Sequence, residues 1–430
     1  MDRALIFSLL AVLVLFAVDY YVYRNWRRFA GQTRWRWTIW PYRVLLVLMP
    51  FAHLVYFGVS NWWTVEPKLL RSVLIGFWFV YYVPKFLLVL ALAVKDFARF
   101  VYWLFSWFQH ALGSSQAEPP VPKPVTPTAK ALDLTDMKRL KRREFIEQMG
   151  WSAASVPFVM VGYGVFRTLY DFEVHRITVP IANLPPQLDG LTIAQLSDLH
   201  AGSFFSERPM QEAADLVNSL RPDVIAVTGD YVNRDDAEMP VMMAGLNQLR
   251  SELATVGVLG NHDHYARVER VIGRVREQSP IDLLVNQHRT LRIDGAHLHL
   301  IGTDNTGFRQ HYADLPGALR NLDVHPQGDE AKILLAHDPT FWDQHVRNSQ
   351  PDIDLMLAGH THGGQIGVEV GPVRWGLARV AYERWAGLYT EERSDGSAHH
   401  LYVNRGLGTV GPPLRVGIRP EVTLLTLRRA

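Results

Sequence analysis

The sequence predicts an α/β domain joined to an N-terminal region of membrane-spanning helices. The first third contains several apolar runs of about 20 residues, the length that a helix needs to cross a bilayer. From residue 177 onward, short apolar segments typical of buried strands each end in a polar loop, with helical stretches between them. Residues 1–112 carry 12 Lys and Arg against 4 Asp and Glu and hold 9 of the 13 Trp, whereas residues 144–430 carry 25 against 35. The two parts are therefore expected to lie in different solvents.

Composition narrows the possible classes of protein. A chain of 430 residues that is 48% hydrophobic has room for about two domains and is too apolar to be disordered. The absence of cysteine excludes a disulfide framework, a thiolate metal site and a cysteine nucleophile. The part after residue 143 is net acidic and shows no basic stripe, which argues against a nucleic-acid partner.

Residues 1–112 are interpreted as a transmembrane region of about three spans. The apolar runs cover residues 4–23, 44–63 and 72–94, and residues 97–111 are interpreted as a continuation or an interfacial helix. A cleaved signal peptide fits the first run less well, because its positive charges follow the apolar core. The loop between the first two runs carries six arginines and no acidic residue, which places this loop in the cytoplasm and the N-terminus outside.

Two segments connect this region to the α/β domain. Residues 113–143 form a Pro-rich linker that ends in a basic cluster, and residues 144–171 form a moderately apolar segment. Arg142-Arg143-Glu144-Phe145-Ile146 resembles a twin-arginine translocation signal, which would make the translocase a partner during export; an ordinary positive flank before a fourth span fits equally well. Both interpretations place residues 172–430 outside the cytoplasm, on a multi-pass protein of the inner membrane. In a competing interpretation this segment lies on the membrane surface or within the helix bundle, and the domain stays cytoplasmic.

Five predicted strands each end in residues that can bind metal ions. The strands cover residues 191–196, 223–228, 255–259, 333–336 and 353–358, and are followed by Asp198-Leu199-His200, Gly229-Asp230, Gly260-Asn261-His262-Asp263, His337 and Gly359-His360-Thr361-His362. Ligands bind at the carboxyl ends of strands in open α/β sheets, so these side chains are expected to meet. Imidazole, carboxylate and amide suit divalent Mn, Fe or Zn, and eight such groups favour two metal ions that share a carboxylate.

Not every histidine needs a functional interpretation. His297 and His299 alternate with apolar residues in the segment 296–300, so we expect them to lie on the exposed face of a strand. A single Asp-x-His is also common in proteins and, taken alone, usually marks a capped turn. Only the repetition at five strand ends gives the pattern its weight.

The five blocks, in this order, resemble the signature of the calcineurin-like metallophosphoesterase superfamily. The resemblance covers about residues 172–430 and implies a four-layer α/β/β/α sandwich. Gly363-Gly364, the tail Asn404-Arg405-Gly406-Leu407-Gly408 and the twin-arginine-like leader are similar to a membrane-anchored bacterial branch that includes the phosphodiesterase YaeI and the phosphoesterase YkuE.

The resemblance also implies roles for individual residues. Asp198, His200 and His362 would bind the first metal ion, Asp230 would bridge, and Asn261, His337 and His360 would complete the second site. His262 would contact the phosphate and help to stabilise or protonate the departing oxygen, with Asp263 as a candidate orienting partner. Arg405 would either reach a substrate phosphate or serve as an ordinary loop arginine.

The expected reaction is hydrolysis of a phosphodiester or pyrophosphate bond by a metal-bridging hydroxide. The substrate is expected to be a phosphate ester, and the membrane tether favours a lipid-linked one. One alternative is the UDP-2,3-diacylglucosamine pyrophosphate hydrolase of lipid A synthesis, but its nucleotide substrate lies in the cytoplasm, on the wrong side for the predicted topology. Another is a non-catalytic envelope binding protein, which the intact ligand set disfavours. A transporter or channel is a third, and the few charged residues in the spans argue against it.

Overall fold

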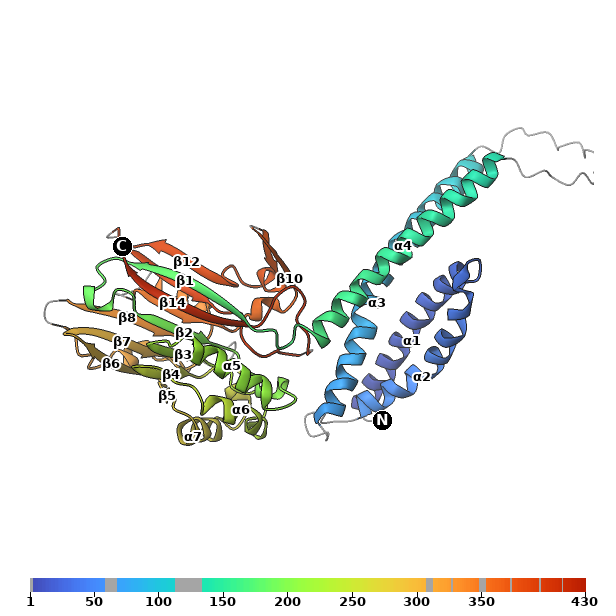
Figure 1. The fold of residues 1–430 in the computed structure, drawn as a ribbon. Helices are drawn as coiled ribbons and strands as arrows, with labels where there is room; N and C mark the ends of the chain where they lie inside the picture. Colours follow the sequence, from blue (N-terminus) through green and yellow to red (C-terminus); the bar gives the residue numbers. More distant parts are fainter. Residues whose placement is uncertain are drawn as a thin grey trace, which may run out of the picture. The chain divides into compact units, whose positions relative to one another are not determined.

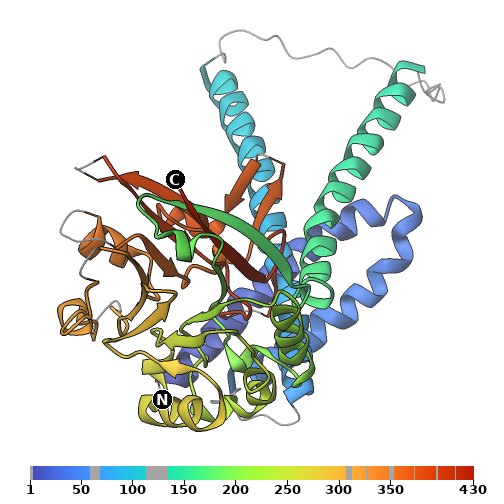
Figure 2. The same ribbon diagram turned by 60° about the vertical axis from the view of Figure 1, so that its left-hand side comes forward.

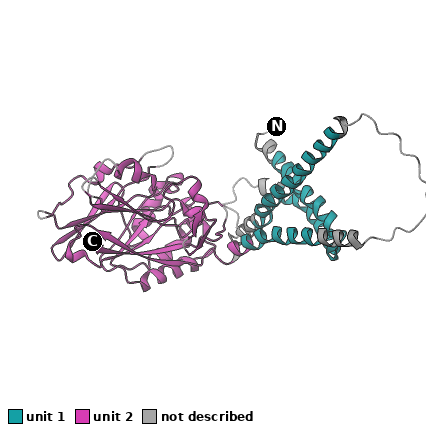
Figure 3. Ribbon diagram, turned by 90° about the horizontal axis from the view of Figure 1, so that it is seen from above, with its two compact units in different colours: residues 1–65, 77–161 teal, residues 66–76, 162–430 magenta. Residues whose placement is uncertain are grey.

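The computed structural model describes residues 3–58, 68–112, 134–306, 312–325, 328–347, 353–371, 373–393, 396–411 and 413–430 (Figure 1). The chain divides into two compact units (Figure 3). The helical unit comprises residues 1–65 and 77–161, and the sheet unit comprises residues 66–76 and 162–430. Residues 113–133 of the predicted Pro-rich linker lie outside the described residues.

The helical unit is built from long helices. These are α1 (Arg3–Ala30), α2 (Ile39–Gly58), α3 (Lys68–Leu112) and α4 (Leu134–Phe166), with the short 3-10 turn η1 (Arg34–Thr38) before α2. Residues 97–111 continue α3 without a break. Within the described residues, the segment Leu9–Ala30 is long and apolar enough to cross a membrane.

A buried ion pair lies inside the helical unit. Lys85 Nζ on α3 is 2.6 Å from Asp19 Oδ1 on α1, and both side chains are almost fully buried. The Tyr82 hydroxyl donates to the second carboxylate oxygen at 2.6 Å, and Lys85 Nζ lies 3.1 Å from the centre of the Tyr81 ring. The two charges that interrupt the apolar runs therefore neutralise each other, as charges within a helix bundle must.

The sheet unit contains two six-stranded sheets and a separate hairpin. The first sheet has the order β1 (Glu173–Ile181), β14 (Glu421–Arg429), β2 (Thr192–Leu196), β3 (Val224–Thr228), β4 (Ala254–Val258), β5 (Asp282–Leu283). The second has the order β12 (Gly387–Glu392), β13 (Ala398–Val403), β9 (Leu355–Ala358), β8 (Glu330–Leu335), β7 (Ala296–Gly302), β6 (Gln287–Ile293). The hairpin pairs β10 (Gly367–Val370) with β11 (Val373–Gly376). The strands predicted at the five motifs correspond to β2, β3, β4, β8 and β9.

Three apolar cores define four layers. The helices α5 (Arg208–Ser219), α6 (Pro240–Leu246) and α7 (Val268–Gln278) cover the outer face of the first sheet, as Figures 1 and 2 show. Between the sheets, side chains such as Ile193 and Val256 pack against Leu300 and Leu357. On the outer face of the second sheet, α8 (Leu315–Ala318) and the turn η7 (Trp342–Val346) contribute to the third core. This arrangement confirms the α/β/β/α sandwich.

The strand directions bring the five motifs together. β2, β3 and β4 run parallel in the first sheet, and β7, β8, β9 and β13 run parallel in the second. Each motif follows the carboxyl end of its strand, so the loops of both sheets meet at one edge of the sandwich.

One expectation about the second sheet was wrong. His297 and His299 lie on β7 as predicted, but the two residues are only 8% and 0% exposed. β7 is an interior strand whose two faces are both covered, and the histidines find polar partners there: His297 Nδ1 is 2.9 Å from the Asp323 carbonyl oxygen, and His299 Nδ1 is 2.9 Å from Thr290 Oγ1.

Candidate metal centre

The carboxyl-edge loops gather the predicted side chains into one buried cluster. Three overlapping groups of carboxylates and imidazoles have their ligand atoms within 4.8 Å of one another: Asp198, His200 and His362; His200, Asp230 and His262; and Asp230, His337 and His360. The shared members His200 and Asp230 connect the groups. The cluster is therefore compatible with a dinuclear metal site rather than with a single ion.

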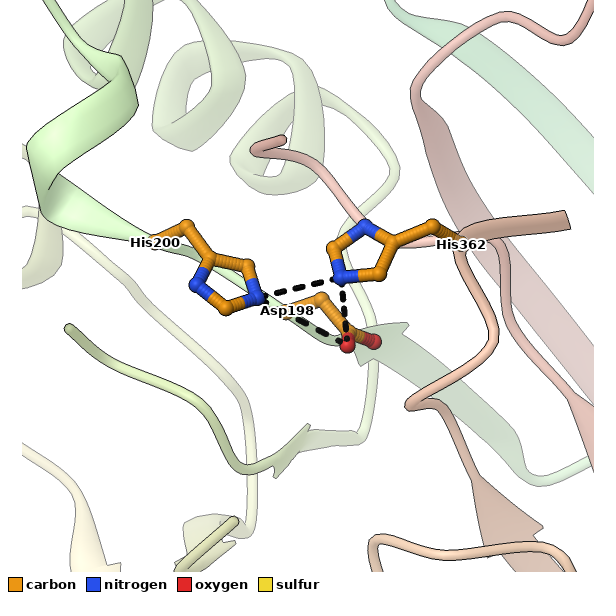
Figure 4. Close-up of side chains that lie close together, drawn as sticks. All are labelled: Asp198, His200 and His362. Atoms are coloured by element: carbon orange, nitrogen blue, oxygen red, sulfur yellow. Dashed lines mark hydrogen bonds and ion pairs between the residues drawn. The ribbon is translucent and has the colours of Figure 1, made fainter. Parts of the chain in front are cut away.

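The first group joins the two sheets (Figure 4). Asp198 and His200 follow β2, whereas His362 follows β9. His362 Nε2 lies 3.2 Å from Asp198 Oδ1 and 3.1 Å from His200 Nε2. Two ring nitrogens and a carboxylate oxygen thus converge on one point, and burial keeps the pKa of His362 well below its usual value, in the neutral form that binds metal ions.

Asp230 lies at the centre of the cluster. Its Oδ2 is 3.4 Å from His200 Nε2 and 3.1 Å from His337 Nε2, while its Oδ1 accepts the backbone N–H of His262 at 2.8 Å. Burial alone would raise the pKa of Asp230, but the charges and hydrogen bonds of His337 and His200 hold this pKa well below its usual value. One oxygen of an ionised carboxylate therefore faces ligands from both sheets, which is the position expected of a bridging ligand.

The second side of the cluster has its ligand atoms fixed by contacts behind them. His337 Nδ1 donates to the Thr228 carbonyl oxygen at 2.7 Å, which directs Nε2 toward Asp230. Burial would lower the pKa of His337, but the charge of Asp230 raises it to about 10. The Tyr382 hydroxyl is 2.9 Å from His360 Nε2 and leaves Nδ1 as the ring nitrogen available to a cation. Such outer contacts fix the tautomer and orientation of metal-binding histidines.

Asn261 provides the strongest test of whether the cluster fits metal ions. Its Nδ2 donates to the Tyr265 hydroxyl at 3.1 Å, but its Oδ1 is buried and has no hydrogen-bond partner among the described residues. An unpaired buried amide oxygen is costly unless a cation occupies the space it faces. The donor set of oxygen and imidazole nitrogen suits divalent transition metals.

The backbone of the cluster is held in an uncommon conformation. Five candidate ligands have positive φ angles: Asp198 (50°), His200 (46°), Asp230 (58°), His360 (71°) and His362 (52°). Non-glycine residues rarely adopt this region, and where they do the surrounding structure must impose it. Glycines allow the required close approach, since a Cβ at Gly359 would overlap Ser197 and Asp198, and one at Gly260 would overlap Asp230.

His262 lies at the edge of the cluster with one nitrogen fixed. Its Nδ1 donates to the Asn233 carbonyl oxygen at 2.6 Å, so Nε2 is the atom left for substrate. Burial lowers the pKa of His262. We expected Asp263 to orient His262, but the acceptor that orients the ring is the Asn233 carbonyl oxygen.

Asp263 instead ties two loops together. Its carboxylate accepts backbone N–H groups of Gly260 at 2.8 Å, Asp230 at 3.0 Å, Tyr231 at 2.8 Å and Val232 at 3.2 Å. Burial and the nearby charge of Asp230 raise the pKa of Asp263. Asp263 therefore positions the loops after β3 and β4, and its carboxylate is bound to the backbone rather than to the His262 ring.

Arg405 is likewise placed differently from the expectation that it reaches a substrate phosphate. Its side chain is 1% exposed, forms an ion pair with Glu421 and lies 2.7 Å from Glu369 Oε1. Two carboxylates already satisfy its charge, so little remains for an anionic substrate. Because these carboxylates lie on β14 and β10, no local pattern around Arg405 could have revealed them.

Sequence reasoning missed Tyr382, Asn233 and Arg415. Tyr382 and Asn233 contact the cluster through a hydroxyl and a backbone carbonyl, groups that leave no spacing pattern. Arg415 is fully buried and donates to the carbonyl oxygens of Arg405, Gly406 and Gly408 at 3.0, 2.9 and 2.6 Å. It thereby fixes the loop whose Gly406 packs against Asp198.

Comparison with known proteins agrees with this geometry. Residues 191–364 match the family model described as calcineurin-like phosphoesterase, and residues 3–169 match the model described as probable calcineurin-like phosphoesterase, transmembrane domain. The metallophosphoesterase YkuE of Bacillus subtilis, which is described as uncharacterized, is 30% identical over 68% of this chain and 99% of its own length. The phosphodiesterase YaeI of Escherichia coli is 32% identical over 67% and 99%. The transmembrane protein with metallophosphoesterase domain of Bos taurus is 31% identical over 65% of this chain and 62% of its own.

Proposed function

Since the chain belongs to the calcineurin-like metallophosphoesterase family, which makes it a metal-dependent phosphoester hydrolase, we propose that it cleaves a phosphodiester or pyrophosphate bond at the cluster around Asp230. The observation that carries the proposal is the position of the Asp230 carboxylate between the ligands of the two sheets. Similarity to a phosphodiesterase supports a diester as the substrate.

The geometry of the cluster supports a role for each ligand. Asp198, His200 and His362 would hold one divalent cation, Asn261, His337 and His360 would hold the other, and Asp230 would contribute to both sites. When bound, the two cations would acidify a water molecule and neutralise negative charge on the phosphate oxygens. The donor set favours Mn, Zn or Fe.

His262 handles the proton of the departing group. Its Nδ1–H is engaged by the Asn233 carbonyl, so proton transfer takes place at Nε2. In hydrolysis a new P–O bond to water forms, the P–O bond to the leaving group breaks, and the leaving oxygen takes up one proton. Because Nδ1 keeps its own hydrogen, Nε2 first takes up a proton from solvent; His262 then delivers this proton to the leaving oxygen and returns to its neutral form.

The experiment measures metal content and hydrolysis together on the full chain in detergent. The protein is stripped with chelator, resupplied with Mn, Zn or Mg, and tested on bis-p-nitrophenyl phosphate, p-nitrophenyl phosphate and UDP-2,3-diacylglucosamine. We expect about two metal ions per chain and metal-dependent cleavage of a diester, with activity reduced at least about 1,000-fold in Asp230→Asn. Asp215→Asn, an exposed carboxylate on α5, is the matched control. Two bound metal ions without turnover of any diester or pyrophosphate would contradict the proposal.

We infer further that residues 1–112 form about three membrane spans, residues 113–143 a linker, residues 144–171 a fourth span or export segment, and residues 172–430 an extracytoplasmic catalytic domain. The arginine-rich loop between α1 and α2 and the similarity of residues 3–169 to a transmembrane domain support this topology. Fusions of alkaline phosphatase and of green fluorescent protein to the C-terminus test it. Active phosphatase with dark fluorescent protein is expected, and the reverse would place the domain in the cytoplasm.

A further inference from the structure

The β10–β11 hairpin presents an apolar face to solvent. Its register pairs Val368 with Trp375 and Val370 with Val373, and side chains directly opposite each other lie on the same face of an antiparallel pair. These four residues are 45%, 42%, 70% and 59% exposed, respectively. One face of the hairpin is therefore entirely apolar and uncovered among the described residues.

The 3-10 turn η9 (Leu377–Val380) follows the hairpin directly and adds two more exposed apolar residues. Leu377 is 48% and Val380 78% exposed. We call the six residues the hairpin patch: Val368, Val370, Val373, Trp375, Leu377 and Val380. Within the described residues of the sheet unit there are eleven exposed large hydrophobic side chains, and six of them belong to this patch. Single exposed apolar residues are ordinary, but a contiguous cluster indicates an interaction surface.

The opposite face fixes the hairpin to the domain. Glu369 points away from the patch and accepts from Arg405 Nη2 at 2.7 Å, and Arg374 Nε is 3.4 Å from the same carboxylate oxygen. The Gly367 N–H donates to the Val416 carbonyl oxygen, and the Leu377 N–H donates to the Ile366 carbonyl oxygen, both at 2.8 Å. The patch is thus held on a tied hairpin rather than on a free loop.

The patch lies beside the metal cluster. A Cβ at Gly376 would overlap the Gly363 carbonyl oxygen, and one at Gly364 would overlap Ala378, so the hairpin and η9 pack directly on the loop that carries His360 and His362. Two residues after η9, Tyr382 reaches His360. Whatever covers the patch is therefore brought next to the candidate catalytic centre.

The chemistry of the patch and of the chain favours a lipid surface as this partner. The same chain carries a membrane-associated helical region, so the sheet unit is tethered near a bilayer. Trp is enriched at the membrane–water boundary, and Arg379, between Leu377 and Val380, is exposed with no ion pair among the described residues, as suits an anionic headgroup.

We propose that the hairpin patch rests in the surface of a lipid bilayer and holds the metal cluster at the depth of the phosphates in lipid headgroups. The reacting phosphate would then belong to a membrane lipid or a lipid-linked molecule. This choice of substrate class rests on the proposed function, whereas the lipid contact does not.

The test uses the absence of native cysteine. The full chain is prepared with a single cysteine, Val370→Cys, labelled with an environment-sensitive nitrobenzoxadiazole dye, and placed in nanodiscs of phosphatidylcholine and phosphatidylglycerol. The matched control is Val324→Cys, also an exposed valine at 58%, which precedes β8 at the sandwich edge opposite the metal cluster. We expect blue-shifted emission and at least twofold quenching by doxyl-labelled lipid at position 370, and neither at position 324.

Two results would overturn the lipid contact. One is equal and weak quenching at both positions. The other is a blue shift at position 370 without quenching by the lipid label, which would mean that protein, such as a second copy of the chain, covers the patch.

A second variant separates the lipid contact from the reaction. Val370→Asp combined with Val373→Asp should lower cleavage of a phosphodiester headgroup in the nanodisc at least fivefold and leave cleavage of soluble bis-p-nitrophenyl phosphate within twofold. Quenching without cleavage of any diester would refute the proposed function and leave the lipid contact standing. Cleavage without quenching would refute the lipid contact and leave the proposed function standing. Equal loss of activity on the lipid and on the soluble substrate would contradict a role of the patch in presenting lipid.

Discussion

Several histidine side chains of the cluster are oriented by a hydrogen bond to one ring nitrogen. His337 is fixed by the Thr228 carbonyl, His262 by the Asn233 carbonyl and His360 by the Tyr382 hydroxyl. Each contact occupies one ring nitrogen and so determines which nitrogen remains for metal or substrate. The tautomer of each of these histidines is therefore fixed by the surrounding protein before any ligand binds.

Tyr382→Phe tests this idea at the residue where the contact is a removable hydroxyl. Loss of the hydrogen bond should weaken retention of the cation assigned to His360, or the activity, by about 10- to 100-fold, the usual effect of removing such a partner. Metal titration followed by calorimetry measures it. The unfolding temperature of the metal-free variant should stay near that of the wild type, and unchanged metal affinity would show that the hydroxyl has no orienting role.

Elements of the sheet unit are tied to one another by a buried network around Glu421. This residue begins β14 and accepts a hydrogen bond from the Tyr402 hydroxyl of β13 at 2.6 Å. It also forms an ion pair with Arg405, which lies in the loop after β13. Arg405 in turn holds Glu369 of the hairpin. The two sheets and the hairpin are thus joined by one chain of charges near the metal edge.

Glu421→Gln should destabilise the folded sheet unit by about 3–5 kcal/mol, because it leaves the buried Arg405 without its main counter-charge. Urea unfolding monitored by circular dichroism measures the loss. Glu252→Gln, at an exposed position, is the control and should change stability by less than about 0.5 kcal/mol. Equal stability of the two variants would contradict the network.

The same residue predicts a pH dependence. Burial would raise the pKa of Glu421, but the charge of Arg405 lowers it below its usual value. A lowered pKa in the folded state means that its contribution to stability is present above about pH 4.3, the unfolded pKa, and is lost as the pH falls through the folded value. Acid unfolding of Glu421→Gln should therefore lack the part of the wild-type slope that lies below about pH 4.3. An identical slope in both proteins would refute this.

In the helical unit, the Asp19–Lys85 pair joins α1 to α3. Asp19→Ala alone should cost about 3–5 kcal/mol, since it leaves a buried ammonium group unpaired, whereas Asp19→Ala with Lys85→Met should cost less than the single change. Thermal unfolding of the two variants in detergent, followed by the loss of the helical circular dichroism signal, compares their stabilities. A double variant no more stable than Asp19→Ala would show that the charges do not compensate each other.

For the molecule as a whole, the cluster couples metal binding to the stability of the sandwich. The ligands come from five loops on two different sheets, so cations bound there would cross-link the layers. A ligand that binds only the folded state stabilises it by about 2.7 kcal/mol when present at 100 times its dissociation constant.

Chelation should therefore lower the unfolding temperature of the sheet unit by several degrees and leave that of the helical unit unchanged. Differential scanning calorimetry of the full chain, with and without chelator, measures both transitions. Asp230→Asn should unfold at the same temperature in both conditions. A wild-type protein that ignores the chelator would contradict metal cross-linking of the sheets.

Much of the fold could be predicted because its signals are local. The five strands follow from short apolar runs that end in polar loops, and β2, β3, β4, β8 and β9 appear at those places. The candidate ligands could be named for the same reason: each lies within a few residues of a strand end, and parallel strands deliver their carboxyl ends to one edge.

What only the tertiary structure decided is the partner of each group. Arg405 is engaged by Glu421 and Glu369, His262 is oriented by Asn233 rather than by Asp263, and His299 is buried although its strand alternates. The hairpin patch became visible only when the register placed four apolar side chains on one uncovered face. Alternation and spacing record what a residue is and where its strand ends, but burial and pairing depend on segments far away in the chain, which meet only when the sheets pack.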